Sequence, residues 1–264
     1  MQPINTFAFA SLLLLLPSDV AADEGSPVSE NTYPLSTQDT AELTKSFEAV
    51  LNSTPILQSA EAVSTDVHSR RGDALFFLAR FKESVTEYQT MVKQNPTLDE
   101  SHWRLGIALF FADQPALAVA QFEKYHSFDN VDRENGIWRY LSQYKATDAA
   151  TAKKELIRYD KDDREPFPAV YKLFDGSFSP EQALANIPKN LSPDEHEKQL
   201  FYTELYIGMH LVVKKQLKEA EKHLRLAVSR KWPRNAGFGP NYMWHVGRVQ
   251  LDLLLKKSQP NTSN

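Results

Sequence analysis

Cysteine is absent from the 264-residue chain. Without a thiol, the protein has no disulfide, thiolate zinc site, iron–sulfur cluster or cysteine nucleophile. Glycine is scarce, at nine residues, compared with an average usage of about 7%. The one Gly-x-Gly, Gly237–Gly239, lacks the third glycine and the preceding strand of a dinucleotide-binding fingerprint. These shortages exclude folds built on phosphate-binding glycine loops and favour an α-helical fold.

An excess of basic charge is also missing. Thirty Lys and Arg residues stand against thirty-four Asp and Glu, which gives a net charge of -4 with no basic run, so we expect no nucleic-acid partner. No two histidines are three or four residues apart, and the acidic segment 160–165 lacks the glycine and closing glutamate of a calcium loop. We therefore expect no metal, no cofactor and a solvated loop at 160–165.

Long hydrophobic runs are confined to the N-terminus. Residues 7–16 form a ten-residue apolar run, followed by Pro17 and the small residues of Val20–Ala22. This pattern is typical of a secretory signal peptide cleaved after Ala22, although no Lys or Arg precedes the run. Ten residues are too few to cross a bilayer, which needs about 20, so we expect no membrane span. The pattern predicts a periplasmic or secreted protein without a lipid-attachment cysteine.

A 34-residue period runs through the chain. Gly72 and Gly106 are 34 residues apart, and Gly208 follows 102 residues later, which is three further periods. A small residue recurs 12 positions after each glycine, and a large one 16 positions after it. This spacing predicts antiparallel helix pairs in which the glycine of the first helix meets both residues of the second. The small residues are Ser84, Ala118 and Ala220, and the large ones are Tyr88, Phe122 and Leu224.

Weaker copies of the period fill the middle of the chain. Segment 138–156 keeps the register, and segment 169–186 holds another predicted helix pair. Ser179-Pro180 and Ser192-Pro193 place a capping serine before a first-turn proline, so we expect helices to begin near 180 and 193.

Helical caps are predicted at both ends of the repeats, over 37–52 and 241–257, to shield apolar faces that would otherwise be exposed. The expected organisation is a signal peptide over 1–22, a disordered leader over 23–35, a repeat domain over 36–257 and a disordered tail over 258–264.

The repeated positions resemble the tetratricopeptide repeat family. The resemblance implies an all-α, right-handed solenoid of about five helix hairpins with capping helices, whose first helices line a concave surface. A second likeness, over roughly 37–255, is to the NlpI family of bacterial periplasmic repeat lipoproteins. It is carried by Trp138-x-Tyr140-Leu141, Val170-Tyr171-x-Leu173-Phe174-x-Gly176 and Phe201-Tyr202-x-x-Leu205-Tyr206-Ile207-Gly208.

The second resemblance implies a cell-envelope adaptor that docks a tail-processing protease and peptidoglycan hydrolases, often as a homodimer. The family's lipid-modified cysteine has no counterpart here, so a membrane anchor is not carried over.

The predicted partner-binding site lies on the concave surface. Two phenylalanine doublets fall on first helices, and we expect one ring of each to pack between helices and the other to line an aromatic floor for a partner peptide. The site residues are Asp73, Phe76, Phe77, Trp103, Phe110 and Phe111.

The sequence predicts a non-catalytic scaffold that binds other proteins or peptides. No Gly-x-Ser-x-Gly elbow is present, and no carboxylate stands in an apolar context that would raise its pKa. Ser69 and Asp73 stand where a carboxylate clamp would need cationic and amide groups, which disfavours an acidic C-terminal tail as ligand. Two alternatives stay open. One is a self-assembling structural envelope protein, and the other is a hydrolase with an unrecognised site, suggested by 160–165 and the histidines.

Overall fold

A computed structural model describes residues 34–54, 63–161 and 163–258. Within these ranges the chain forms thirteen α-helices, one 3-10 helix and no strand, which confirms the all-α prediction. The predicted signal peptide, nearly all of the leader, and the tail from 259 onward lie outside these ranges. The helices are α1 Thr37–Ser53, α2 Thr65–Phe77, α3 Phe81–Gln94, η1 Pro96–Leu98, α4 Trp103–Phe111, α5 Pro115–Phe128, α6 Arg133–Ala146, α7 Ala149–Lys154, α8 Phe167–Asp175, α9 Pro180–Ala185, α10 Pro193–Val213, α11 Leu217–Ser229, α12 Trp232–Asn235 and α13 Phe238–Ser258.

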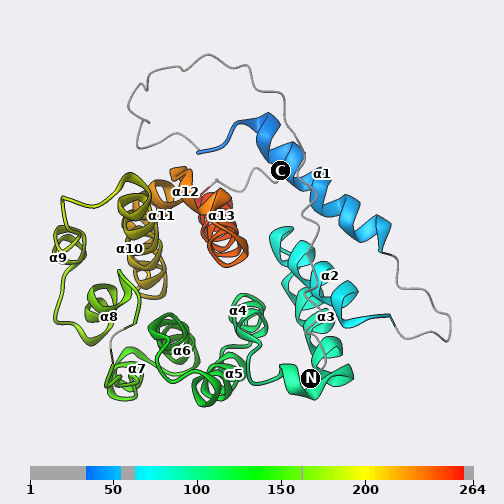
Figure 1. Cartoon of the computed structure of the whole chain (residues 1–264), viewed down its shortest axis with the longest axis horizontal. Coiled ribbons are helices and arrows are strands. Elements are labelled where there is room, and N and C mark those ends of the chain that lie inside the picture. The colour runs from blue at the N-terminus through cyan, green and yellow to red at the C-terminus, as the bar shows by residue number, and fades with distance from the viewer. Residues whose placement is uncertain (1–33, 55–62, 162, 259–264) are drawn as a thin grey trace, which may run out of the picture.

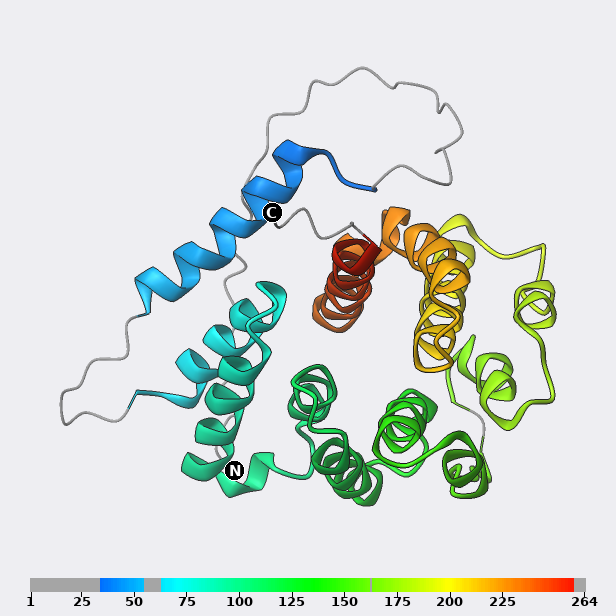
Figure 2. The same ribbon diagram turned by 180° about the vertical axis from the view of Figure 1, so that it is seen from behind.

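Consecutive helices pack in pairs that follow one another around a ring (Figure 1). The reverse view shows the same course, with α13 beside the inner side of α2 and α4 (Figure 2). The Tyr242 ring of α13 stacks on Phe76 at 5.5 Å between centroids, and Arg248 Nη2 donates to the Phe77 carbonyl at 2.6 Å. The C-terminal helix therefore closes the ring against the helices near its start.

The glycines at the 34-residue period lie where the two helices of a pair come closest. A Cβ added at Gly72 would lie 2.4 Å from the Tyr88 ring, and one at Gly106 would lie 2.6 Å from the Phe122 ring. At Gly208 the nearest atom would be Cγ of Leu224, at 2.7 Å. The predicted contact of each glycine with the large residue 16 positions later is confirmed.

The turns inside these pairs also repeat. In each pair the residue two positions after the first helix has a positive φ, in the left-handed region that side-chain-bearing residues seldom adopt. These residues are Ala79 at 58°, Asp113 at 60° and Lys215 at 61°. They too are separated by 34 and 102 residues, so the period fixes the backbone of the turn as well as the helix contacts.

A buried ion pair recurs with its partners exchanged. His68 Nδ1 of α2 lies 2.6 Å from Glu87 Oε2 of α3. Four periods later, at 204 and 223, the first helix supplies the glutamate and the second the histidine, and the two side chains again meet. Either order joins a histidine and a glutamate across the same helix seam.

The predicted serine N-caps of α9 and α10 are confirmed. Ser179 and Ser192 accept hydrogen bonds from the backbone N–H groups of Gln182 and Glu195, and α9 and α10 begin at the following prolines. Leu35, the last residue of the predicted leader, is buried against the core. None of the helices in the described ranges combines the length and apolarity needed to cross a membrane.

Candidate functional site

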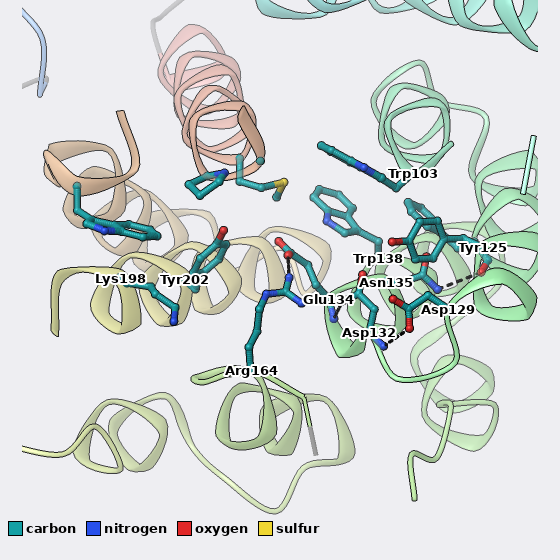
Figure 3. Close-up of a pocket in the computed structure, with 15 residues that line it drawn as sticks. Trp103, Tyr125, Asp129, Asp132, Glu134, Asn135, Trp138, Arg164, Lys198 and Tyr202 are labelled. Atoms are coloured by element: carbon teal, nitrogen blue, oxygen red, sulfur yellow. Dashed lines mark hydrogen bonds and ion pairs between the residues drawn. The ribbon is translucent and has the colours of Figure 1, made fainter. Parts of the chain in front are cut away.

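A cavity of about 510 Å³ opens on the inner side of the ring, bounded by α4, α5, α6, α10, α12 and α13 (Figure 3). This volume falls in the range of about 300–1,000 Å³ that is usual for ligand sites. The lining residues combine aromatic rings with charged groups. They are Trp103, Phe122, Tyr125, Asp129, Asp132, Glu134, Asn135, Trp138, Arg164, Lys198, Tyr202, Trp232, Gly239, Pro240 and Met243.

The aromatic part of the wall is held by contacts between helices. Trp138 of α6 stacks on Phe122 of α5, with a ring-centroid distance of 6.3 Å and an angle of 17°. Trp232 of α12 lies 6.2 Å from Tyr202 of α10. Because each ring packs against a neighbouring helix, the wall is shaped before any ligand arrives.

The acidic part of the wall comes from the connection between α5 and α6. Asp129 Oδ1 accepts from the backbone N–H groups of Val131 and Asp132, at 3.0 and 3.2 Å. Asp132 caps α6 by accepting from the Glu134 N–H at 3.0 Å. These local bonds hold the Asp129 and Asp132 carboxylates, which line the cavity together with that of Glu134 (Figure 3).

Arg164 binds this acidic cluster from the connection between α7 and α8. Its Nη2 lies 2.5 Å from Glu134 Oε2, and its Nη1 lies 3.4 Å from Asp132 Oδ1 and 3.2 Å from Asp163 Oδ2. The prediction of a solvated loop at 160–165 is wrong for Asp163, whereas the Arg164 side chain is 44% exposed. The Asp163 side chain is only 11% exposed, because its carboxylate accepts from the Arg133 backbone N–H and pairs with Arg164.

Burial raises the pKa of Glu134 to about 7, although the Arg164 guanidinium opposes the shift. Burial also raises the pKa of Asp132. The expectation that no carboxylate lies in such surroundings is therefore wrong. The burial depends on tertiary contacts, since Tyr206, which donates to Glu134 Oε1, is 72 residues away in the chain; its hydrogen bond, like Arg164, opposes the rise in pKa.

Both oxygens of Glu134 accept hydrogen bonds, Oε1 from Tyr206 and Oε2 from Arg164. The carboxylate is thereby fixed in the wall, whereas a general acid or base must reach a proton of the substrate. The cavity wall therefore presents carboxylates beside aromatic rings, an arrangement that suits ligand binding better than proton transfer. In the described ranges, no group of three or more His, Asp or Glu side chains is placed to hold a metal ion.

One of the six predicted site residues, Trp103, lines this cavity. Phe76 and Phe110 are buried, whereas Phe77 and Phe111 are only partly buried and pack against the core, and none of the four lines this cavity. Asp73 accepts from Arg104 Nη1 at 2.6 Å and from the Tyr88 hydroxyl at 2.6 Å.

The partly buried Phe77 faces the chain's own C-terminal helix. Its ring centroid lies 4.2 Å from that of His245 and 5.1 Å from that of Tyr242, both in α13. The part of the predicted aromatic floor around Phe77 is therefore in contact with α13, and the open space lies further along the ring, beside Trp103.

Sequence reasoning missed Glu134, Asn135, Arg164 and Trp232 as cavity residues. One signal was available, because Asp132 followed by Glu134 is an acidic helix start.

A comparison with models of known protein families finds none that matches the chain.

The pH dependence of stability tests the buried state of Glu134. The folded pKa of about 7 exceeds the ordinary value of 4.5, so the folded protein holds this proton more tightly and loses stability as the pH rises from 4.5 through 7. The variant Glu134→Gln has no carboxylate to titrate at this position. Its unfolding free energy minus that of the wild type should therefore increase by about 2–3 kcal/mol between pH 5 and pH 8.

Urea denaturation at pH 5, 6, 7 and 8 measures this shift. The control is Glu48→Gln, at an exposed position of α1. A difference for Glu134→Gln that stays constant across the range would contradict a buried carboxylate with a raised pKa.

Proposed function

We propose that the chain is a tetratricopeptide-like solenoid that acts as a non-catalytic scaffold and binds partner proteins through the cavity on the inner side of its ring. The repeat assignment is supported by glycine contacts and left-handed turns that recur at multiples of 34 residues. Stacked helix pairs of this kind typically use their concave surface for binding.

The observation that carries the proposal is the cavity itself. It joins rings from α4, α5, α6, α10 and α12 with charged side chains, and aromatic residues in such recesses are common anchors of protein interfaces. Its volume of about 510 Å³ suits one or two side chains of a partner rather than a long extended segment.

The place of action we propose is the bacterial cell envelope. It rests on the predicted signal peptide at 1–22 and on the resemblance to the NlpI family, whose members dock a protease and peptidoglycan hydrolases. Enzymes of these two kinds are therefore the partners to test first.

Self-association is a second candidate, favoured by a specific surface feature. Leu117 and Phe128 of α5 are 53% and 60% exposed, and their spacing of 11 residues places them on one face of the helix. Size-exclusion chromatography with light scattering on the wild type and on Leu117→Ser, Phe128→Ser would separate a dimer formed through this face from a monomer.

The scaffold proposal predicts that partner capture depends on the cavity rings. The double variant Trp103→Leu, Trp232→Leu keeps apolar side chains but removes two rings from the wall. Pull-down from an envelope extract, followed by mass spectrometry, should recover proteins with the wild type that fall at least about tenfold with the variant, since an interface anchor contributes about 2 kcal/mol or more.

The control is Leu217→Ala, which changes an exposed apolar side chain outside both the cavity and the α5 face that carries Leu117 and Phe128. Far-ultraviolet circular dichroism and thermal melting establish that each variant is folded. Equal capture by the folded double variant and the wild type would rule out the cavity as the docking site.

A further inference from the structure

The cavity carries more negative charge than its own cations neutralise. Three carboxylates line it, those of Asp129, Asp132 and Glu134, against two cations, Arg164 and Lys198. Both cations also pair with carboxylates that are not among the lining residues, Arg164 with Asp163 and Lys198 with Glu195. An incoming positive charge would therefore be attracted, and an incoming carboxylate repelled.

A buried acceptor in the wall lacks a partner. Asn135 is 3% exposed, and its Nδ2 donates to the Phe122 carbonyl at 3.1 Å. Because a carbonyl can only accept, this bond fixes the orientation of the amide. The Asn135 Oδ1 is then left buried without a hydrogen-bond partner, although buried polar atoms are nearly always satisfied. A ligand with an N–H donor would satisfy it.

The aromatic rings of the cavity wall suit the same ligand. Trp103, Tyr125, Trp138 and Trp232 line the cavity together with Asn135, and aromatic faces attract ammonium and guanidinium groups. The side chain of a lysine or arginine in a peptide would bring the N–H donor that Asn135 Oδ1 lacks.

We propose that the cavity binds a lysine or arginine side chain of a partner peptide. The inference deepens the proposed function and rests on it. An acidic side chain would meet uncompensated carboxylates, and an apolar one would leave Asn135 Oδ1 unsatisfied. A cationic side chain instead places its stem against the rings and its charge beside Asp129 and Asn135.

Binding should also depend on pH. A cation in the cavity favours the ionised form of Glu134, whose surroundings are Arg164 and Asp163 from the α7–α8 connection, Asp132 ahead of α6, and Tyr202 and Tyr206 from α10. The affinity for a cationic peptide should therefore rise between pH 6 and pH 8.

The experiment uses the full chain and four blocked tripeptides, N-acetyl-Ala-X-Ala-amide, in which X is lysine, arginine, norleucine or glutamate. Isothermal titration calorimetry and tryptophan fluorescence measure binding. The lysine or arginine peptide should bind saturably, and the norleucine and glutamate peptides at least about tenfold more weakly, as expected when a hydrogen bond to a charged group is lost.

The test variant is Asp129→Asn, which removes the charge but keeps the Oδ1 that accepts the two backbone N–H groups. It should weaken cationic peptide binding about tenfold. The control is Asp113→Asn, at an 89% exposed side chain in the left-handed α4–α5 turn, where asparagine fits well. This control should leave binding unchanged.

The outcomes separate the inference from the proposed function. A norleucine or glutamate peptide that binds as tightly as the lysine and arginine peptides overturns the cationic assignment and leaves the scaffold proposal standing. So does binding of none of the peptides while Trp103→Leu, Trp232→Leu still loses its partner. If free arginine binds but no peptide does, the peptide assignment fails, and the cavity is a small-molecule site.

Discussion

Replacing Arg164 by alanine should lower the free energy of unfolding at pH 8 by about 1–3 kcal/mol. This is less than the cost of breaking a fully buried ion pair, because the Arg164 side chain is itself 44% exposed and solvent screens part of the attraction. The variant leaves three carboxylates close together without the guanidinium that pairs with all of them. Two of these, Glu134 and Asp163, have side chains only 14% and 11% exposed, so water cannot fully replace the lost cation.

The loss should be smaller at pH 5, because the raised pKa values of Glu134 and Asp132 allow them to take up protons once Arg164 is gone. Urea denaturation at both pH values gives the two free energies. The control is Arg80→Ala, which breaks an exposed pair with Glu83 and should cost about 0–1 kcal/mol. Equal losses for Arg164→Ala at pH 5 and pH 8 would show that repulsion among the carboxylates is not the cause.

Replacing Phe122 by alanine should cost about 3–5 kcal/mol, as is typical when a buried aromatic residue is truncated. Its ring is fully buried, fills the close approach at Gly106 and stacks on Trp138. Gly106→Ala should cost about 1–3 kcal/mol through overpacking, because the added Cβ would lie 2.6 Å from that ring.

The double variant Gly106→Ala, Phe122→Ala should cost clearly less than the sum of the two single variants. The methyl group of alanine at 106 then occupies space that the ring has left, so the clash disappears and the void shrinks. Gly239→Ala serves as the control, since a Cβ there meets no atom within 4 Å. Strict additivity in denaturation experiments would contradict the seam described for the repeats.

The fold could be predicted from the sequence where the contacts are local and periodic. Gly106 and Phe122 are 16 residues apart, and the same spacing recurs in the other pairs. The sequence therefore repeats the pattern that this contact between a glycine and a large side chain requires. The position of α13 is different, because it depends on a contact such as Arg248 with Phe77, 171 residues apart and made once. Nothing in the pattern of either segment indicates the other.

The candidate site escaped prediction for the same reason. Arg164 meets Glu134 across 30 residues and Tyr206 meets it across 72, so the burial that raises the pKa of Glu134 has no local signature. Trp103 was identified because it lies on a first helix, where repeat geometry points side chains inward. The partner of Asp73, Arg104, was visible in the sequence but could not be paired with it before the helices were placed.

The contact between α13 and α2 changes how the chain should come apart. In an open stack, each helix pair depends only on its neighbours, and the outermost pair can fray alone. Here the last helix rests on one of the first, through Tyr242 on Phe76 and Arg248 on the Phe77 carbonyl. Separating α13 from α2 would expose both Tyr242 and Phe76, so these two distant parts of the chain should unfold together.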